Sequence, residues 1–259
     1  MKKIIFILVM ITLMSSSDDK SYKQAFETGE WFKLRIHYGI INAGYATMEV
    51  KEKIRNNRKM HYVVGYGQTV GLTKLFFEVE DHYQSIFDKE TGKPYQFLRK
   101  INEGGYKKYQ EGFFNHKEQT VLLKDHQENT QKTFTVPENV QDVVSSFYYL
   151  RNHPKVDQLN INESIEIKMF FDDELLKFQL KYLGKEELST KFGKIMCLKF
   201  RPMVLSGRVF KEEESLTVWV SEDQNKIPIR IKAELAVGSL KADLDDYRGL
   251  KHTIKFIDN

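Results

Sequence analysis

The alternation of apolar and polar residues constrains this fold more than any other feature of the sequence. In residues 32–38, FKLRIHY, the apolar Phe32, Leu34 and Ile36 alternate with basic side chains. A period of two is typical of a β-strand with one face buried and the other in solvent. Similar runs recur along the chain and are rich in Val, Ile, Phe, Tyr and Thr, which favour strands. The sequence therefore predicts a mainly β protein.

Short breaks separate these runs about every ten residues. They contain the Gly, Pro, Asn, Asp and other charged residues that are typical of tight turns. The breaks are NN (56–57), DKETGKP (88–94), NEGG (102–105), NHKEQ (115–119), DDE (172–174), KFGK (191–194) and SEDQNK (221–226). Because tight turns join antiparallel neighbours, we predict an antiparallel meander in one domain, folded as a sandwich or a barrel.

One stretch departs from the alternation and predicts a helix. In residues 137–154, PENVQDVVSSFYYLRNHP, side chains from Val140 to Arg151 recur at steps of three and four, with Phe147 and Tyr148 among them. This spacing indicates a helix of about three turns with one apolar face. Pro137 and Asn139 suit its start and Pro154 suits its end. A second, shorter helical turn is predicted in residues 70–76, VGLTKLF.

The break SEDQNK has two possible interpretations, a binding site or a turn. A calcium loop needs acids at alternating positions followed by a bidentate glutamate, and Glu222 and Asp223 supply only an adjacent pair. We therefore predict a hairpin turn. Pro228, just beyond it, cannot donate a ladder hydrogen bond, so we expect a sheet edge or a bulge there.

The N-terminus has the three-part layout of a secretory signal peptide. Two lysines precede an apolar run at residues 4–14, and small polar residues follow to Ser17. The apolar run is shorter than the roughly 20 residues that span a bilayer. We therefore expect a signal peptide at 1–17, a leader at 18–28 and one β-rich domain at 29–259. The mature chain would have no transmembrane segment and would be exported, periplasmic or secreted.

Charge and motif content exclude several function classes. The chain carries 40 basic and 36 acidic residues, interspersed along its length, so nucleic acid is not an expected partner. The seven histidines do not show the spacing of metal ligands, and neither a nucleophile elbow nor a phosphate-binding glycine loop is present. We assign no catalytic, metal-binding or cofactor-binding residue and expect no cofactor. The single cysteine, Cys197, suits a small buried apolar position.

Three segments together resemble the DUF3108 family of exported bacterial proteins, whose members lack an assigned activity. They are GEWFKLRIHYGIINAGYATMEV (29–50), DVVSSFYYLRNHP (142–154) and LTVWVSEDQNKIPIRIKAELAVGSLKADL (216–244). The resemblance spans roughly residues 29–244 and implies a β-rich fold similar to the open barrels of lipoprotein carriers. It thus implies an antiparallel meander that forms an open or half barrel, with the one main helix packed on the concave face. It carries no catalytic residues.

A curved sheet with one apolar helix across it encloses either a packed core or a cavity for an apolar guest. The leading hypothesis is a non-enzymatic binding or carrier protein for an apolar ligand such as a lipid, with Phe147 and Tyr148 in contact with the ligand. One alternative is an envelope interaction or assembly factor that engages a protein partner through a strand edge near Pro228 or a surface patch. Another is an envelope hydrolase.

Overall fold

The computed structural model describes residues 24–204 and 216–257, and the predicted signal peptide lies outside this part. The described residues form fourteen strands and two helices. The strands are β1 (Trp31–Tyr38), β2 (Ile41–Arg55), β3 (Arg58–Thr69), β4 (Glu80–Asp88), β5 (Pro94–Glu103), β6 (Tyr106–Asn115), β7 (Thr120–Asp125), β8 (Thr130–Thr135), β9 (Ser164–Phe171), β10 (Glu174–Thr190), β11 (Gly193–Val204), β12 (Leu216–Ser221), β13 (Pro228–Glu234) and β14 (Ser239–Arg248). The helices are α1 (Gly71–Phe76) and α2 (Val143–Arg151).

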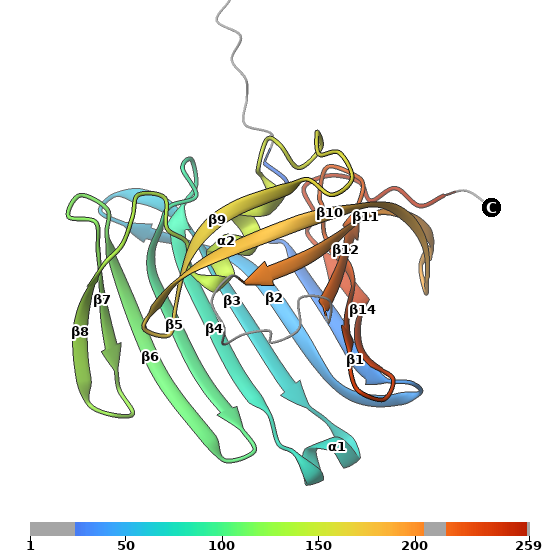
Figure 1. The fold of residues 1–259 in the computed structure, drawn as a ribbon, viewed down its shortest axis with the longest axis horizontal. Coiled ribbons are helices and arrows are strands. Elements are labelled where there is room, and N and C mark those ends of the chain that lie inside the picture. The colour runs from blue at the N-terminus through green and yellow to red at the C-terminus, as the bar shows by residue number, and fades with distance from the viewer. Residues whose placement is uncertain (1–23, 205–215, 258–259) are drawn as a thin grey trace, which may run out of the picture.

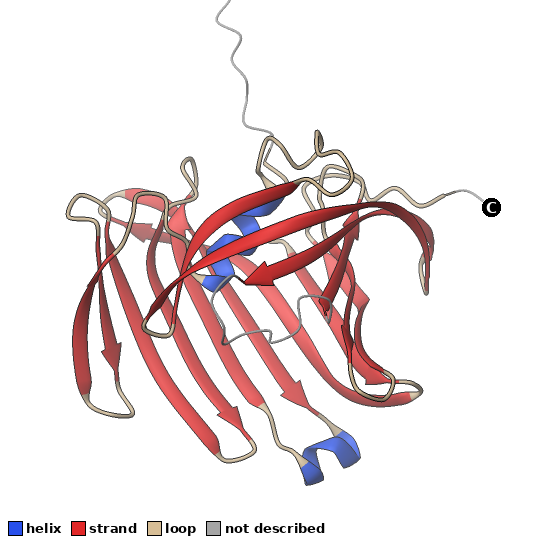
Figure 2. Cartoon of the chain, in the orientation of Figure 1, coloured by secondary structure: helices blue, strands red, loops and turns tan. Residues whose placement is uncertain are grey.

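The strands form one antiparallel sheet that curls into an open barrel. Each strand pairs with its sequence neighbours where the connection is a hairpin, and β1 also pairs with β14, which leaves β8 and β9 at the two ends. Strands dominate the fold, and α2 lies inside the curl on its concave face (Figures 1 and 2). The predicted mainly β meander, an open barrel with one main helix on the concave face, is confirmed.

The predicted breaks are confirmed as connections between neighbouring strands. Asn56 and Asn57, for example, join β2 to β3 with φ angles of 49° and 58°. This left-handed conformation is what a two-residue hairpin turn requires, and asparagine tolerates it better than most residues. The helical turn predicted in residues 70–76 is confirmed as α1, which connects β3 to β4.

The main helix starts later than the sequence pattern predicts. The prediction of a start at Pro137 or Asn139 is wrong, because Asn139 has a φ of 61°, outside the right-handed helical region. Gln141 is held by β9 instead: its N–H donates to the Lys168 carbonyl at 2.9 Å, and its carbonyl accepts from the Phe170 N–H at 2.8 Å. The backbone therefore becomes helical only after this bridge.

Asp142, directly after this bridge, is the N-cap residue of α2. Its carboxylate accepts hydrogen bonds from the N–H groups of Val144 and Ser145 at 2.8 and 2.9 Å, and from the Ser85 hydroxyl at 2.6 Å. The Ser145 hydroxyl in turn accepts from the Asp142 N–H at 2.9 Å, which completes a capping box. The cap thus ties the start of α2 to β4.

Pro228 lies at a bulge and not at a sheet edge. β13 pairs with β12 on one side and with β14 on the other, so the predicted edge is wrong. The register of β12 against β13 shifts between Trp219 and Val220, opposite Pro228, so the predicted bulge is confirmed. The missing N–H of proline is accommodated by this irregularity.

The SEDQNK segment is a hairpin turn, as predicted, but its last residues are buried. Asn225 and Lys226 are 0% and 6% exposed. The Asn225 side chain donates to the His252 carbonyl and accepts from the His252 N–H, each at 2.9 Å. The end of the turn is therefore part of the packed interior and not a solvated tip.

A buried ion pair fixes the other end of α2. The Arg151 guanidinium donates to both carboxylate oxygens of Glu30 at 2.6 and 2.7 Å, and the two side chains are 2% and 0% exposed. Its Nε and Nη2 also donate to the Asn225 carbonyl at 3.0 and 2.8 Å. Arg151 thereby joins α2 to the residue before β1 and to the β12–β13 turn.

The residues ahead of β1 contribute to the core. Ala25 and Phe26, from the predicted leader, are buried, and the Phe26 ring packs edge-on against Tyr148 with centroids 4.5 Å apart. Residues that precede the first strand therefore form part of the core beside α2. In the described residues, no helix has the length and apolar content needed to cross a membrane.

Replacing Arg151 with methionine should destabilise the protein by about 3–5 kcal/mol, because Glu30 would remain buried without a partner. Urea unfolding monitored by circular dichroism measures this. Lys59→Met, which breaks an exposed pair with Glu52 at 3.1 Å, should cost less than about 1 kcal/mol. A loss below about 1 kcal/mol for Arg151→Met would show that the buried pair does not anchor α2.

The free energy of unfolding should depend on pH through the Asp142 carboxyl. Burial raises the pKa of Asp142 from its ordinary 3.8 to about 6, although its hydrogen bonds oppose the shift. The folded state thus holds this proton more tightly than the unfolded state, and the stabilisation present below pH ~4 disappears as the pH rises through ~6.

Asp142→Asn keeps a capping side chain but does not titrate. We therefore compare the free energies of unfolding of the wild type and of Asp142→Asn. Their difference, wild type minus variant, should fall by up to about 3 kcal/mol between pH 4 and 6 and stay constant from pH 6.5 to 8. Thermal and urea unfolding at each pH provide the comparison. A difference that does not change with pH would contradict the raised pKa.

Candidate functional site

Two adjacent apolar cavities lie between α2 and the concave face of the sheet. The first has a volume of about 400 Å³ and lies between α2 and strands β9 to β12. The second, also about 400 Å³, lies between α2 and strands β1 to β4, with β12 and β13 at its side. Four described residues line both cavities and therefore lie where the two meet: Tyr83, Val143, Phe147 and Val218.

Strand alternation produces the wall of the first cavity. Every second residue along three neighbouring strands points into it, as expected for a pleated strand. These residues are Phe178 and Leu180 of β10, Phe200, Pro202 and Val204 of β11, and Leu216, Val218 and Val220 of β12. The same period of two that predicts the strands therefore also builds an apolar wall.

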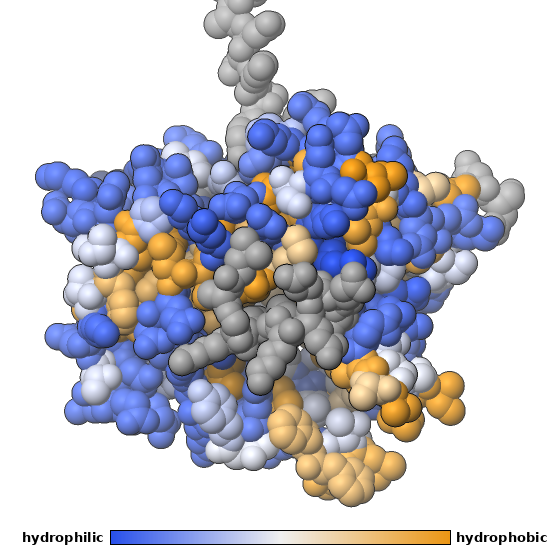
Figure 3. Space-filling view, viewed as in Figure 1, coloured by the Kyte–Doolittle hydropathy of each residue, from blue (hydrophilic) through white to orange (hydrophobic). Residues whose placement is uncertain are grey.

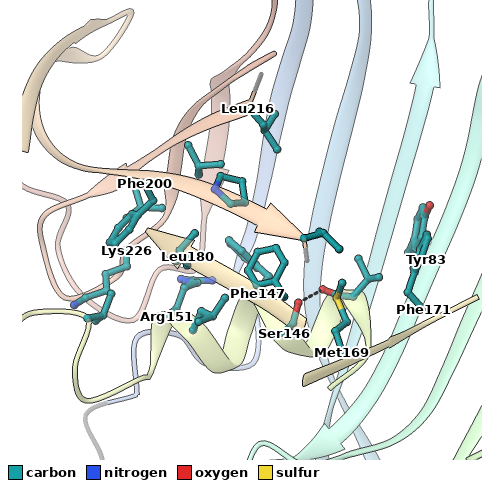
Figure 4. Close-up of a pocket in the computed structure, with 18 residues that line it drawn as sticks. Tyr83, Ser146, Phe147, Arg151, Met169, Phe171, Leu180, Phe200, Leu216 and Lys226 are labelled. Carbon is teal, nitrogen blue, oxygen red and sulfur yellow. Dashed lines mark hydrogen bonds between the residues drawn. The ribbon is translucent and has the colours of Figure 1, made fainter. Parts of the chain in front are cut away.

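Phe147 and Tyr148, the two predicted ligand contacts, lie on different sides of α2. Phe147 is half-buried and projects from the helix into the space between the cavities (Figure 4). Tyr148 is fully buried against Phe26 and Phe87 and lines neither cavity. Ligand contact stays a prediction for both residues, and the geometry favours it for Phe147 and gives Tyr148 a packing position.

The polar groups at the first cavity are occupied by partners within the protein. The Ser146 hydroxyl donates to the Val143 carbonyl at 2.7 Å, and Arg151 is bound to Glu30. The Lys226 ammonium lies 3.0 Å from the Asp157 carboxylate. The remaining lining residues are apolar except Tyr83, whose pKa is raised by burial, so its hydroxyl stays neutral.

Within the part of the chain that the structure describes, the nucleophilic and titratable groups of the interior do not form a catalytic arrangement at these cavities. Cys197 is fully buried, lines neither cavity, and has its pKa raised to about 12 by burial, so it is a thiol at neutral pH. His61 is buried beside Phe26, and burial lowers its pKa to about 4. In the described ranges, His, Cys, Asp and Glu do not gather in a group of three that could hold a metal ion.

Asp81, at the second cavity, is the lining residue with the most perturbed carboxyl. Burial first, and then the neighbouring Glu103, raise its pKa to about 6, although it accepts a hydrogen bond from the Asn102 N–H at 3.1 Å. A carboxyl in this pKa range can exchange protons near neutral pH. The shift is accounted for by the position of Asp81 on β4, beside Asn102 and Glu103 of β5.

Sequence reasoning missed several residues of the site. Arg151 falls at an apolar-face position of the helix pattern, and a charge at such a position is a signal of a buried pair. Its partners, Glu30 and Asn225, lie 121 and 74 residues away and could not be identified from spacing. Lys226 was assigned to a turn, and its burial depends on the curl of the sheet.

A solved structure supports the fold. The chain is similar to a β-barrel-like protein of the DUF1849 family from Brucella abortus, with a TM-score of 0.59 and 8% identity over 87% of this chain and all of that one. A DUF1089 family protein from Pseudomonas aeruginosa matches with a TM-score of 0.38 and 8% identity, over 80% of this chain and 92% of that one. No curated protein matches the sequence.

The likeness to the Brucella protein, at this identity, concerns the fold alone. The family model DUF3108, described as a protein of unknown function, matches residues 33–245, which is most of the chain. The match covers all fourteen described strands, except for the first two residues of β1 and the last three of β14. The predicted resemblance is therefore confirmed, and the chain belongs to the DUF3108 family.

Proposed function

We propose that the protein is an exported, non-enzymatic carrier that holds an apolar ligand, a lipid or another acyl chain, between α2 and the curved sheet. The signal-peptide layout of residues 1–17 supports export to the periplasm or beyond. The observation that carries the proposal is the pair of adjacent apolar cavities on either side of Phe147.

The lining favours a hydrocarbon over a polar ligand. Of the described residues around the first cavity, fourteen of eighteen are apolar. The ammonium, guanidinium and hydroxyl groups of Lys226, Arg151 and Ser146 already have partners within the protein. A polar ligand would lose its hydration without gaining hydrogen bonds, whereas a hydrocarbon chain loses only its contact with water.

The cavity dimensions also suit a ligand. Small-molecule sites have volumes of roughly 300–1,000 Å³ and are lined mainly by apolar side chains. Each cavity, at about 400 Å³, lies within this range, and the Phe147 side chain lines both. A chain-like ligand that displaced the Phe147 ring would occupy both.

The two alternatives have less support. An interaction factor that adds a strand near Pro228 has no edge to use there, because β13 is paired on both sides, which leaves a surface patch as its other route. A hydrolase could use Asp81, but the pKa of Asp81 is explained by burial and by Glu103. We therefore retain the carrier as the proposed function.

Val218→Trp should weaken binding of an apolar fluorescent probe, N-phenyl-1-naphthylamine, by about tenfold or more, which corresponds to about 1.4 kcal/mol. Val218 lines both cavities, and the larger indole would fill space in each. Fluorescence titration gives the dissociation constant of each variant.

The matched control is Thr217→Trp, which adds the same side chain to the opposite face of β12. It should bind the probe like the wild type. Circular dichroism and thermal unfolding establish that both variants are folded. If Val218→Trp folds and binds the probe as tightly as Thr217→Trp, the cavities are not the binding site.

A further inference from the structure

One rim of the barrel carries a concentration of exposed apolar side chains. We define the α1 rim as the β1–β2 turn, the segment 70–79 that contains α1, the β5–β6 turn and the β13–β14 turn, with the strand ends that they join. Of the fifteen large apolar side chains exposed within the described ranges, eleven lie on the α1 rim. They are Tyr38, Ile40, Ile41, Leu72, Leu75, Phe76, Phe77, Tyr106, Leu235, Val237 and Leu240.

These four connections form one continuous surface. The Val70 N–H donates to the Ala43 carbonyl at 3.0 Å, and the Gly104 N–H donates to the Glu78 carbonyl at 2.7 Å. The Tyr38 hydroxyl donates to a carbonyl of the β13–β14 turn at 2.9 Å. Figure 3 shows the resulting apolar surface over α1 at the lower edge and over the neighbouring turns at the lower right.

The degree of exposure is high for such residues. Ile40 is 98% exposed, Phe76 is 87% and Leu75 is 80%. Contiguous exposed apolar surface of this kind marks an interaction site in a folded protein. The opposite rim differs: its described exposed apolar side chains are Ile54, Ile161 and Ile257, which pairs with β11 beside the β10–β11 turn, and its other turns are mainly polar.

We infer that the α1 rim docks the protein on the surface of a lipid bilayer. The apolar residues stand on separate projecting turns, a form that enters a fluid interface more readily than it fits the flat, shape-matched core of a protein interface. Tyr38 and Tyr106 lie beside them, and tyrosine is enriched where a protein meets the bilayer interface.

The charge distribution of the rim agrees with insertion into lipid. Two of the four connections, GIIN (39–42) and LAVGSL (235–240), carry no charge, whereas the β5–β6 turn has Glu103 on one side and Lys107 on the other. Lys74 of α1 is paired with Glu78 at 3.2 Å, four residues along the chain. Because the rim has no excess of basic residues at its tips, we expect attachment to depend on apolar insertion and not on anionic lipids.

The second cavity lies toward the α1 rim, and this position connects docking with ligand binding. In this respect the inference rests on the proposed carrier function. Gly67 and Asp81, which line the cavity, are near the end of β3 and the start of β4, next to the segment that contains α1. Phe26 and the Arg151–Glu30 pair are buried beside the C-terminal end of α2. A lipid could therefore pass between bilayer and cavity at the docked rim.

Vesicle flotation with the full mature chain tests the docking. The wild type should float with vesicles of phosphatidylcholine alone, and 0.5 M salt should not release it. The double variant Leu75→Glu/Phe76→Glu should lower the partition coefficient by about tenfold or more, because charged side chains would replace apolar ones at the bilayer. Ile54→Glu/Ile161→Glu, with the same charge change on the opposite rim, should float like the wild type.

The outcomes separate docking from ligand binding. A wild type that fails to float but binds N-phenyl-1-naphthylamine would overturn docking and leave the carrier proposal standing. If the wild type does not float and sedimentation velocity shows oligomers that the Leu75→Glu/Phe76→Glu variant loses, the rim binds a second copy of the chain, and the lipid assignment is wrong. Equal flotation of both double variants would also contradict it.

Discussion

The buried ion pair between Arg151 and Glu30 holds together parts of the chain that are far apart in sequence. A guanidinium in this position must be fully paired, since an isolated buried charge is too costly to retain. The pair therefore fixes the end of α2 against the start of β1 and, through the Asn225 carbonyl, against the β12–β13 turn. Together with the Asp142 cap, which binds β4 through Ser85, it sets the position of the helix on the sheet.

This anchoring explains how the interior can hold cavities. Both ends of α2 are fixed by polar contacts, so the helix does not need to be in full apolar contact with the sheet along its length. On one side Tyr148 packs closely against Phe26 and Phe87, and near the C-terminal end Leu150 packs against residues of β9 to β12. Phe147 packs edge-on against Phe32 and lines both cavities, which are the feature that the proposed function uses.

Local sequence signals predicted the local structure, and the misses came from long-range contacts. The strand predicted at residues 32–38 and the Asn56–Asn57 turn depend on neighbouring residues and were confirmed. The predicted alternation fails at the end of that strand, where the register shifts after Ile36, His37 is buried and Tyr38 is exposed. The start of α2 was wrong because Gln141 bonds β9, and no local pattern reveals that bridge. The buried position of Lys226 likewise depends on how the sheet curls, and the side of α2 that faces a cavity depends on the polar anchors at its ends.

The most direct test of the carrier proposal is native mass spectrometry of the mature protein purified from an envelope fraction, followed by organic extraction and identification of what is released. The proposal predicts a stoichiometric apolar adduct that organic solvent removes. A protein of bare mass that also fails to take up added fatty acids or phospholipids would contradict the carrier function.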